Sequence, residues 1–193
     1  MSSNKKVLEN LVSRTKIYLI IMKTIANAVQ SEIGPRNVLE RLGSWTMFTK
    51  GDHEFDFKIN SEDKKDGNVS LEVNYYGQKE PEHYLSYYQT VPVTPGKSYV
   101  LTGKVKAEHS ESFTVSASNW SNAVNLKGDY DWKDFKIDYT APLDASSTII
   151  RIIVEDIATG LKFDDFSFKE KDSDKELLSD PSFEKMSFEV DNY

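Results

Sequence analysis

The chain has 193 residues, of which 38% are hydrophobic and 12% aromatic, and it carries a net charge of −7. The length suits one domain of ordinary size with a smaller appendage, and the many tyrosines and phenylalanines are typical of β-rich proteins. An acidic chain without a basic stripe argues against nucleic acid or an acidic membrane as partner, and the lack of cysteine excludes disulfides and thiolate metal sites. The apolar run from Ile17 to Met22 is too short to span a bilayer and has no small-residue cleavage site, so neither a membrane span nor a secretory signal peptide is predicted.

Residues 1–33 are predicted to form a helix. Asn4 to Ser31 contain no glycine or proline, and apolar side chains recur at intervals of three and four. The stripe consists of Val7, Leu11, Tyr18, Ile21, Ile25 and Ala28. So broad an apolar stripe is not stable alone in water, so the helix either docks on its own or a neighbouring domain or forms a homo-oligomeric stalk. Gly34 and Pro35 end the helix and mark a domain boundary.

Residues 36–169 predict an all-β sandwich. Short runs of β-branched and aromatic residues alternate with turn clusters, and no helical periodicity interrupts them. The predicted strands are 37–40, 44–49, 53–60, 70–76, 84–93, 98–106, 113–120, 132–140, 148–155 and 162–169.

The stretch 89–107 predicts a hairpin within this sandwich. Alternating residues, Val91 and Val93 before the turn and Tyr99 onward after it, flank Pro95 and Gly96. Proline presets a negative φ and glycine accepts a positive one, as a β-turn requires. We therefore expect the two half-buried strands to pair with each other in a register fixed by the turn.

Six short motifs occur in the order found in one known family. They are Asn37-Val38-Leu39, Gly43-Ser44-Trp45, the Asp66-Gly67-Asn68 turn with its following strand, the Pro95-Gly96 turn with its flanking strands, Trp132 with Phe135, and the closing Lys162-Phe163-Asp164-Asp165-Phe166-Ser167. With these motifs, residues 37–169 resemble the jelly-roll carbohydrate-binding modules that accompany bacterial xylanases, glucanases and chitinases and that also occur in phage tail proteins. The resemblance implies a jelly-roll β-sandwich, which the α-helix predicted for residues 1–33 precedes, and it identifies the fold far better than the ligand.

The resemblance also gives a meaning to residues 170–193. Residues 170–175 are charged and predict a linker. Leu177 and Leu178, followed by Pro181-Ser182-Phe183-Glu184, look like the opening of the family, so a truncated second module is predicted to start at about Glu176. The other interpretation is a terminal strand that packs back on the first sandwich.

A structural calcium ion is the cofactor that the resemblance implies. The family site uses a glutamate from the opening Pro-Ser-Phe-Glu segment, which the first module lacks, together with the closing Asp-Asp pair and oxygens near the Asp-Gly turn. In the opening strand, the Asp-Gly turn and the closing Asp-Asp pair, this chain has Glu40, Asp66 and Asp164, which are therefore the candidate ligands. Their carboxylates suit calcium, which takes six to eight oxygen ligands.

A sugar site pairs flat aromatic rings with a few polar side chains, so the aromatic residues that leave the core are the candidates. Strand alternation sends Glu72, Asn74 and Tyr76 away from the core side of Leu71 and Val73. On another predicted strand, alternation anchored on Phe113, Val115 and Ala117 sends Trp120 outward, next to Asn119. Trp120 is the strongest candidate for a stacking platform.

Tyr84 and Tyr88 also leave the core if Gln89, Val91 and Val93 face inward. The dense group formed by these two residues and Tyr87 fits either a ligand contact or a tyrosine-lined edge of the sandwich, and a one-residue slip in register would exchange Tyr87 for its neighbours.

Four other aromatic residues, Trp45, Trp132, Tyr99 and Phe163, stand at family positions that pack the core. They are therefore predicted to have structural roles.

An enzyme is not predicted. Glu54 and Asp56 would share one face of a strand, but they lie beside a Lys-Gly turn and fit a solvated strand end better than a catalytic pair. His53, His83 and His109 are spread over separate polar loops without zinc-ligand spacing.

The sequence thus predicts a non-catalytic, extracellular module, on a virion tail or a secreted protein, that binds a polysaccharide or cell-wall glycan. The alternative is a structural or protein-interaction sandwich of a virion or surface assembly that binds no sugar.

Overall fold

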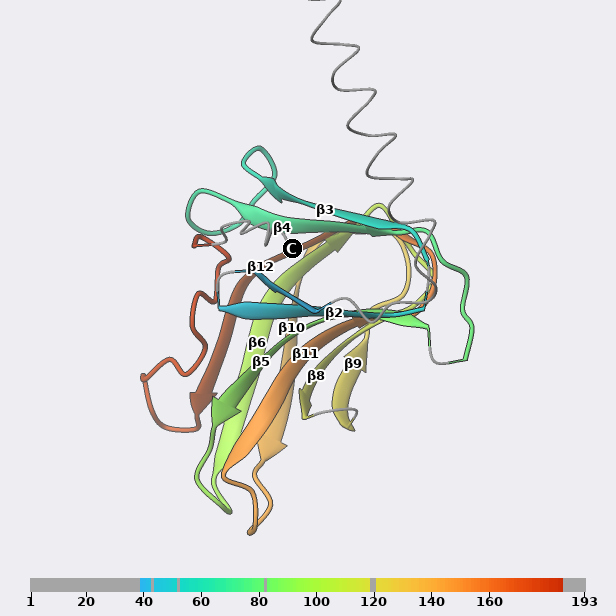
Figure 1. The fold of residues 1–193 in the computed structure, drawn as a ribbon. Helices are drawn as coiled ribbons and strands as arrows, with labels where there is room; N and C mark the ends of the chain where they lie inside the picture. The colour runs from blue at the N-terminus through green and yellow to red at the C-terminus, as the bar shows by residue number, and fades with distance from the viewer. Residues whose placement is uncertain (1–38, 43, 52, 82, 119–120, 186–193) are drawn as a thin grey trace, which may run out of the picture. The chain divides into compact units, whose positions relative to one another are not determined.

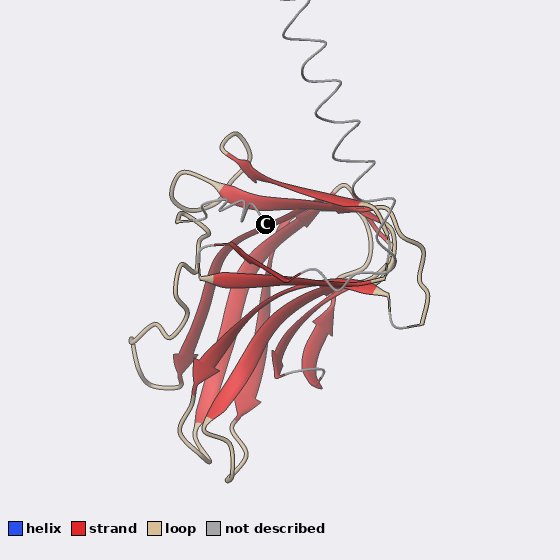
Figure 2. Ribbon diagram, in the orientation of Figure 1, coloured by secondary structure: helices blue, strands red, loops and turns tan. Residues whose placement is uncertain are grey.

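The computed structural model describes residues 39–185 apart from 43, 52, 82 and 119–120, and of residues 39–42 it describes the strand only. These residues form two antiparallel sheets packed face to face (Figures 1 and 2). Sheet A runs β1 (Leu39–Leu42), β2 (Trp45–Lys50), β5 (Tyr84–Pro92), β11 (Ser147–Val154), β8 (Phe113–Ser118), β9 (Ser121–Asn125). Sheet B runs β10 (Tyr130–Thr140), β6 (Ser98–Ala107), β12 (Ala158–Glu170), β4 (Ser70–Tyr75), β3 (Phe55–Asn60), and β7 (His109–Ser110) pairs with β12.

The predicted all-β sandwich is confirmed, and its two antiparallel sheets are consistent with a jelly roll. The predicted helix of residues 1–33 and the boundary at Gly34 lie outside the described residues. Where the structure describes the chain, it contains no helix long and apolar enough to cross a membrane.

The core lies between the sheets and is filled by alternate residues of each strand. On β5, Leu85, Tyr87 and Val91 are buried, and the intervening Tyr84 and Tyr88 are only partly buried. The predicted direction of each of these tyrosines is therefore confirmed. The predicted core positions of Trp45, Tyr99 and Phe163 are confirmed as well, since each is at most 2% exposed.

The predicted pairing of the two strands around Pro95 and Gly96 is wrong. The turn itself forms, with Gly96 at φ +73° and Lys97 N donating to Thr94 O over 3.2 Å. However, β5 belongs to sheet A, where it pairs with β2 and β11, and β6 belongs to sheet B, where it pairs with β10 and β12. The turn therefore carries the chain from one sheet to the other, and both strands bury their apolar sides in the same core.

Residues 176–184 pack on the sandwich itself. Phe183 is fully buried and stacks on the ring of Trp45, with the centroids 5.2 Å apart. The Trp45 indole donates to the carbonyl of Asp180 over 3.0 Å, and the Gln89 amide exchanges hydrogen bonds with the backbone of Ser179. The segment predicted to open a second module therefore belongs to this sandwich, which was the other interpretation, and a further module stays a prediction.

Candidate functional site

The outer face of sheet A presents a row of side chains that crosses several strands. Thr46 of β2 stands opposite Tyr88 of β5, Tyr88 opposite Arg151 of β11, and Arg151 opposite Ser116 of β8. Opposed residues in a sheet point to the same side. The neighbouring positions, such as Tyr87, are buried in the core, so this row faces outward.

A second row lies beside the first. It consists of Phe48, Ser86, Ile153 and Thr114, and the pair Lys50 and Tyr84 follows it toward the ends of β2 and β5. We call the surface formed by these two rows and this pair the tyrosine face.

Aromatic rings and a guanidinium group form the centre of the tyrosine face. The rings of Phe48 and Tyr84 are tilted against each other with their centroids 5.8 Å apart. The Arg151 guanidinium lies over the Tyr88 ring, 5.4 Å from its centroid. Burial lowers the pKa of Arg151, and Tyr84 and Tyr88 oppose this shift. Because arginine stays protonated in proteins, this face combines flat apolar rings with a cationic hydrogen-bond donor.

Ser86 adds an unsatisfied polar group to the tyrosine face. Its side chain is 1% exposed, and its hydroxyl has no hydrogen-bond partner among the described residues. It stands between Phe48 and Ile153 in the second row. Because this hydroxyl is buried, it offers no contact to a ligand on the surface, and leaving it unpaired costs about 1–3 kcal/mol.

Three predicted ligand residues, Glu72, Asn74 and Tyr76, lie on the opposite side of the molecule, on the outer face of sheet B. The Tyr76 hydroxyl donates to Asp56 over 2.8 Å, and the Asn74 amide donates to the same carboxylate over 2.7 Å. The structure therefore does not bring these three residues together with Tyr84 and Tyr88. Trp120 and Asn119 lie outside the described residues.

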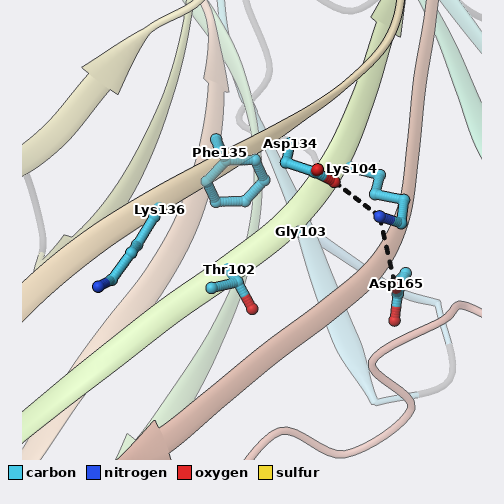
Figure 3. A pocket seen from close by; sticks show the side chains of 7 residues that line it. All are labelled: Thr102, Gly103, Lys104, Asp134, Phe135, Lys136 and Asp165. Carbon is cyan, nitrogen blue, oxygen red and sulfur yellow. Dashed lines mark hydrogen bonds and ion pairs between the residues drawn. The ribbon is translucent and has the colours of Figure 1, made fainter.

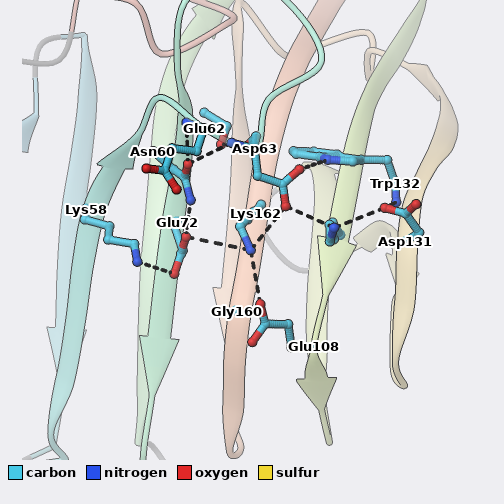
Figure 4. Close-up of polar contacts among 12 residues, drawn as sticks. Lys58, Asn60, Glu62, Asp63, Glu72, Glu108, Asp131, Trp132, Gly160 and Lys162 are labelled. Carbon is cyan, nitrogen blue, oxygen red and sulfur yellow. Dashed lines mark hydrogen bonds and ion pairs between the residues drawn. The ribbon is translucent and has the colours of Figure 1, made fainter.

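Charged side chains cover the outer face of sheet B (Figure 4). Lys162 of β12 is 3% exposed, and its ammonium lies 3.7 Å from Glu72, 3.6 Å from Asp63 and 3.5 Å from Glu108. We call these four residues, with Lys58 and Lys106, the charged network. Lys58 pairs with Glu72 over 2.9 Å, and Lys106 pairs with Asp63 over 3.0 Å.

The predicted core position of Trp132 is wrong. Its indole donates to Asp63 over 2.7 Å, and its side chain is only partly buried beside the charged network. The buried residues of β10 begin at Phe135, and Tyr130, beyond a register shift between Tyr130 and Lys133, packs partly buried against the core. Trp132 stands three positions before the buried Phe135, so strand alternation places it on the side opposite to Phe135, whereas the family resemblance alone implies its core position. The role of Trp132 is structural, but on the surface.

The charged network predicts how stability depends on pH. Burial alone would raise the pKa of Glu72, but hydrogen bonds from Lys58 and Asn60 and the charge of Lys162 bring the pKa below its ordinary value. A carboxylate whose pKa is lowered by folding stabilises the fold above its unfolded pKa and loses that contribution as the pH falls through the folded pKa. We expect the gap in unfolding free energy between the wild type and Glu72→Gln to stay constant from about pH 7 to about pH 5.5 and to shrink toward about pH 3.

Urea denaturation of both proteins across this range measures the gap. A gap that stays constant down to the lowest pH would show that Glu72 is not held in its ionised form by these partners.

A shallow hollow lies on the outer face of sheet B, beside the bulge of β12 (Figure 3). Lys104 stands at its edge between Asp134, at 2.6 Å, and Asp165, at 3.9 Å. These three charges pair with one another, and Lys136, which also lines the hollow, lies 3.7 Å from Asp138. We assign no site to it.

Two of the three predicted calcium ligands, Asp66 and Asp164, lie at the Asp66-Gly67 turn. Asp164 is fully buried, and its carboxylate accepts the backbone N–H groups of Lys65, Asp66 and Asp165 over 2.6, 2.9 and 2.7 Å. Burial raises the pKa of Asp164, and these hydrogen bonds oppose the rise. The carboxylate of Glu184 accepts the amides of Asn68 and Val69 at the same turn, so the C-terminal segment supplies a glutamate here.

Among the described residues, no three acidic or histidine side chains at this turn bring their ligand atoms within 4.8 Å of one another. The side chain of Glu40 lies outside the described part. A calcium ion would have to take lone pairs of Asp164 that now accept amide protons. Calcium binding stays a prediction.

The prediction that the histidines lie apart is wrong for two of them. Nε2 of His53 and Nδ1 of His83 are 2.9 Å apart, although the residues are separated by 30 positions in the sequence. His109 is separate, and it pairs with Glu111 and Asp129.

The comparisons with known proteins agree with this fold. Residues 36–159, more than half of the chain, match the carbohydrate-binding domain family. No curated protein sequence matches the chain.

Among solved structures, the enzymatically active domain of tailspike protein 4 of bacteriophage CBA120 superposes with a TM-score of 0.54 at 16% identity. That match covers 68% of this chain, which spans only 20% of the tailspike chain. The family 11 carbohydrate-binding module of the cellulase Lic26A-Cel5E of Clostridium thermocellum gives a TM-score of 0.46 at 16% identity, covering 69% of this chain and 93% of that one. The xylan-binding domain of Xyn10C of Paenibacillus barcinonensis gives 0.45 at 15% identity, covering 73% and 99%.

At these identities the structural likeness concerns the fold, and the family rests on the sequence match over residues 36–159. With the two-sheet sandwich and the aromatic outer face of sheet A, that match shows that this chain belongs to the carbohydrate-binding domain family, and its role is the recognition of a polysaccharide.

Proposed function

We propose that the tyrosine face is the surface that binds the polysaccharide, with Tyr84 and Tyr88 as stacking platforms and Arg151 as the main hydrogen-bond donor. The observation that supports this most is the presence of aromatic rings and a guanidinium group together on one outward surface. Sugar rings have apolar C–H faces edged by hydroxyl groups, so they need flat rings and a few polar groups side by side.

The outer face of sheet B is the weaker candidate. Tyr76 is 47% exposed, but its hydroxyl is used by Asp56. Glu72 is held by Lys58, Asn60 and Lys162. Polar groups that already have partners gain little from a sugar hydroxyl, because binding would exchange one hydrogen bond for another.

Substitutions of matched tyrosines distinguish the two faces. We expect Tyr88→Ala and Tyr84→Ala each to weaken binding roughly tenfold or more, because each removes a ring on which a sugar stacks. Tyr76→Ala, an equally large truncation on the other sheet, should leave the affinity within about twofold. Affinity gel electrophoresis with soluble xylan, mixed-linkage glucan, galactan and solubilised bacterial cell wall, followed by calorimetry on the best binder, measures these effects.

Three other outcomes have distinct meanings. A loss of binding in Tyr76→Ala alone would move the site to sheet B. A loss in Trp120→Ala alone would move the site to residues 119–120, which lie between β8 and β9 in the sequence. If the wild type binds no polysaccharide while remaining folded, the chain is a structural or protein-interaction member of its family.

The location of the protein and its lack of catalytic activity also belong to this proposal. We infer a non-catalytic module on an extracellular protein, either a phage tail or a secreted multi-module protein, because carbohydrate-binding domains generally serve such proteins. The fold likeness to a phage tailspike agrees with the first of these settings.

A further inference from the structure

Three potential metal ligands meet beside the ends of β2 and β5. Nδ1 of His83 lies 2.9 Å from Nε2 of His53 and 3.3 Å from Oε2 of Glu80. The ligand atoms of all three residues lie within 4.8 Å of one another. His53 precedes β3, and Glu80 and His83 precede β5, so the cluster joins two separate connections of the sandwich.

The backbone holds both imidazole rings in place. A Cβ atom added to Gly77 would lie 2.3 Å from Cγ of His53, and one added to Gly51 would lie 2.6 Å from Cγ of His83. Each ring therefore packs directly on a glycine, where any other residue would collide with it. The Tyr75 ring meets the His53 ring edge-on, with the centroids 5.7 Å apart.

The turn that carries Glu80, the third ligand, is also held in place. His83 N donates to Glu80 O over 3.2 Å, which closes the turn from Glu80 to His83. Lys79 N donates to the Asp156 carboxylate over 3.2 Å and so fastens the same connection to the end of β11. The ligands therefore stand on backbone that is held by several contacts.

Hydrogen bonds within this cluster cannot satisfy all three of its ligand atoms. A neutral imidazole has one N–H, so Nδ1 of His83 can donate to either His53 or Glu80 but not fully to both. A cation placed among the three atoms would satisfy all their lone pairs together. Two imidazole nitrogens bound to one tetrahedral zinc ion at about 2.0–2.1 Å stand about 3.3 Å apart, a few tenths of an ångström more than the spacing here.

We propose that His53 Nε2, His83 Nδ1 and Glu80 form a binding site for a divalent zinc-like cation. Two imidazoles and one carboxylate suit zinc and related late transition metals, whereas calcium requires a shell of oxygens. The ion links the connection before β3 to the connection before β5, and Tyr84 follows His83 directly. The site does not depend on sugar binding.

Calorimetry of the full, untagged and chelator-treated chain with ZnCl2 tests the site. We expect one zinc ion per chain and a rise in melting temperature of about 5–10 °C when zinc exceeds its dissociation constant about a hundredfold. His53→Ala and His83→Ala should each weaken zinc binding at least about a hundredfold, and Glu80→Gln by about tenfold or more. His109→Ala is the matched control, because it removes a histidine flanked by Glu111 and Asp129 and should bind zinc like the wild type.

The results that would overturn the site are equally specific. Unchanged zinc affinity in both His53→Ala and His83→Ala, or a loss confined to His109→Ala, would exclude it, as would the absence of stoichiometric binding by the wild type. Co²⁺ absorption of the wild type gives a second measurement that does not depend on the folding of any variant. Intense visible bands of a four-coordinate cobalt ion are expected, and a spectrum of hydrated cobalt would contradict the proposal. Calcium in large excess should not displace zinc, and displacement would point to an oxygen site instead.

Discussion

Phe183→Ala is expected to lower the free energy of unfolding by about 3–5 kcal/mol, the range for removing a fully buried phenylalanine ring. The Phe183 ring stacks on Trp45 at 5.2 Å and meets Phe166 edge-on at 5.7 Å, so its loss leaves a cavity against two other aromatic rings. The residue also has φ +59° although it is not glycine. Such a backbone conformation persists only where the surroundings hold it, and here the buried ring does so.

Chemical denaturation measures this effect. Leu143→Ala is the control, because Leu143 is 86% exposed and its truncation should change stability by no more than about 0.5 kcal/mol. Equal stabilities of Phe183→Ala and the wild type would mean that residues 176–184 do not belong to this sandwich and would restore their assignment to a separate module.

Lys162→Met is expected to cost about 3 kcal/mol, because it removes the cation shared by Glu72, Asp63 and Glu108. Breaking a buried ion pair by removing one partner leaves an uncompensated charge, at about 3–5 kcal/mol. Asp63 is partly exposed and Glu72 keeps Lys58, so the lower end of this range applies.

Lys58→Met supplies the matched comparison in the same denaturation experiment. Lys58 binds the same carboxylate of Glu72 at 2.9 Å, but its side chain is 60% exposed. Its loss should cost much less than the loss of Lys162, because exposed ion pairs contribute little to stability. Similar losses in the two variants would show that burial does not set the strength of this network.

Much of the fold is predictable from local patterns. Alternation on β5 correctly separates buried Tyr87 from outward Tyr84 and Tyr88, because a strand side chain has only two directions. The pairing of strands is not local. The Pro95-Gly96 turn has the right chemistry for a hairpin, yet it joins strands of different sheets, because period-two alternation is the same in either case.

Two strands also escaped prediction. β7 has only two residues, His109 and Ser110, and β9 (Ser121–Asn125) is polar and lies at the edge of sheet A. Edge strands need little apolar character, so composition does not reveal them.

Only part of the candidate site could be predicted, because strand parity gives the direction of a side chain but not the sheet to which its strand belongs. Parity shows that Tyr76 and Tyr88 both leave the core, but it does not show that they leave from opposite sheets. Arg151 was missed, although a signal exists: a single arginine between Ile150 and Ile152 marks the outward position of an otherwise apolar strand.

Phe48 carries a signal of the same kind. It has opposite parity to Trp45 and Met47, which are buried, so it belongs to the outward side of β2. The meeting of His53 with His83 has no sequence signal, because it depends on how two separate connections fold.

The most direct test of the tyrosine face is a chemical-shift map of the isotope-labelled chain, titrated with a short oligosaccharide of the polysaccharide that binds best. Amide signals of β2, β5 and β11 around Phe48, Tyr88 and Arg151 should shift with saturation, and those of β3 and β4 should stay in place. Shifts centred on Asn74 and Tyr76, with β5 unchanged, would contradict the assignment of glycan binding to sheet A.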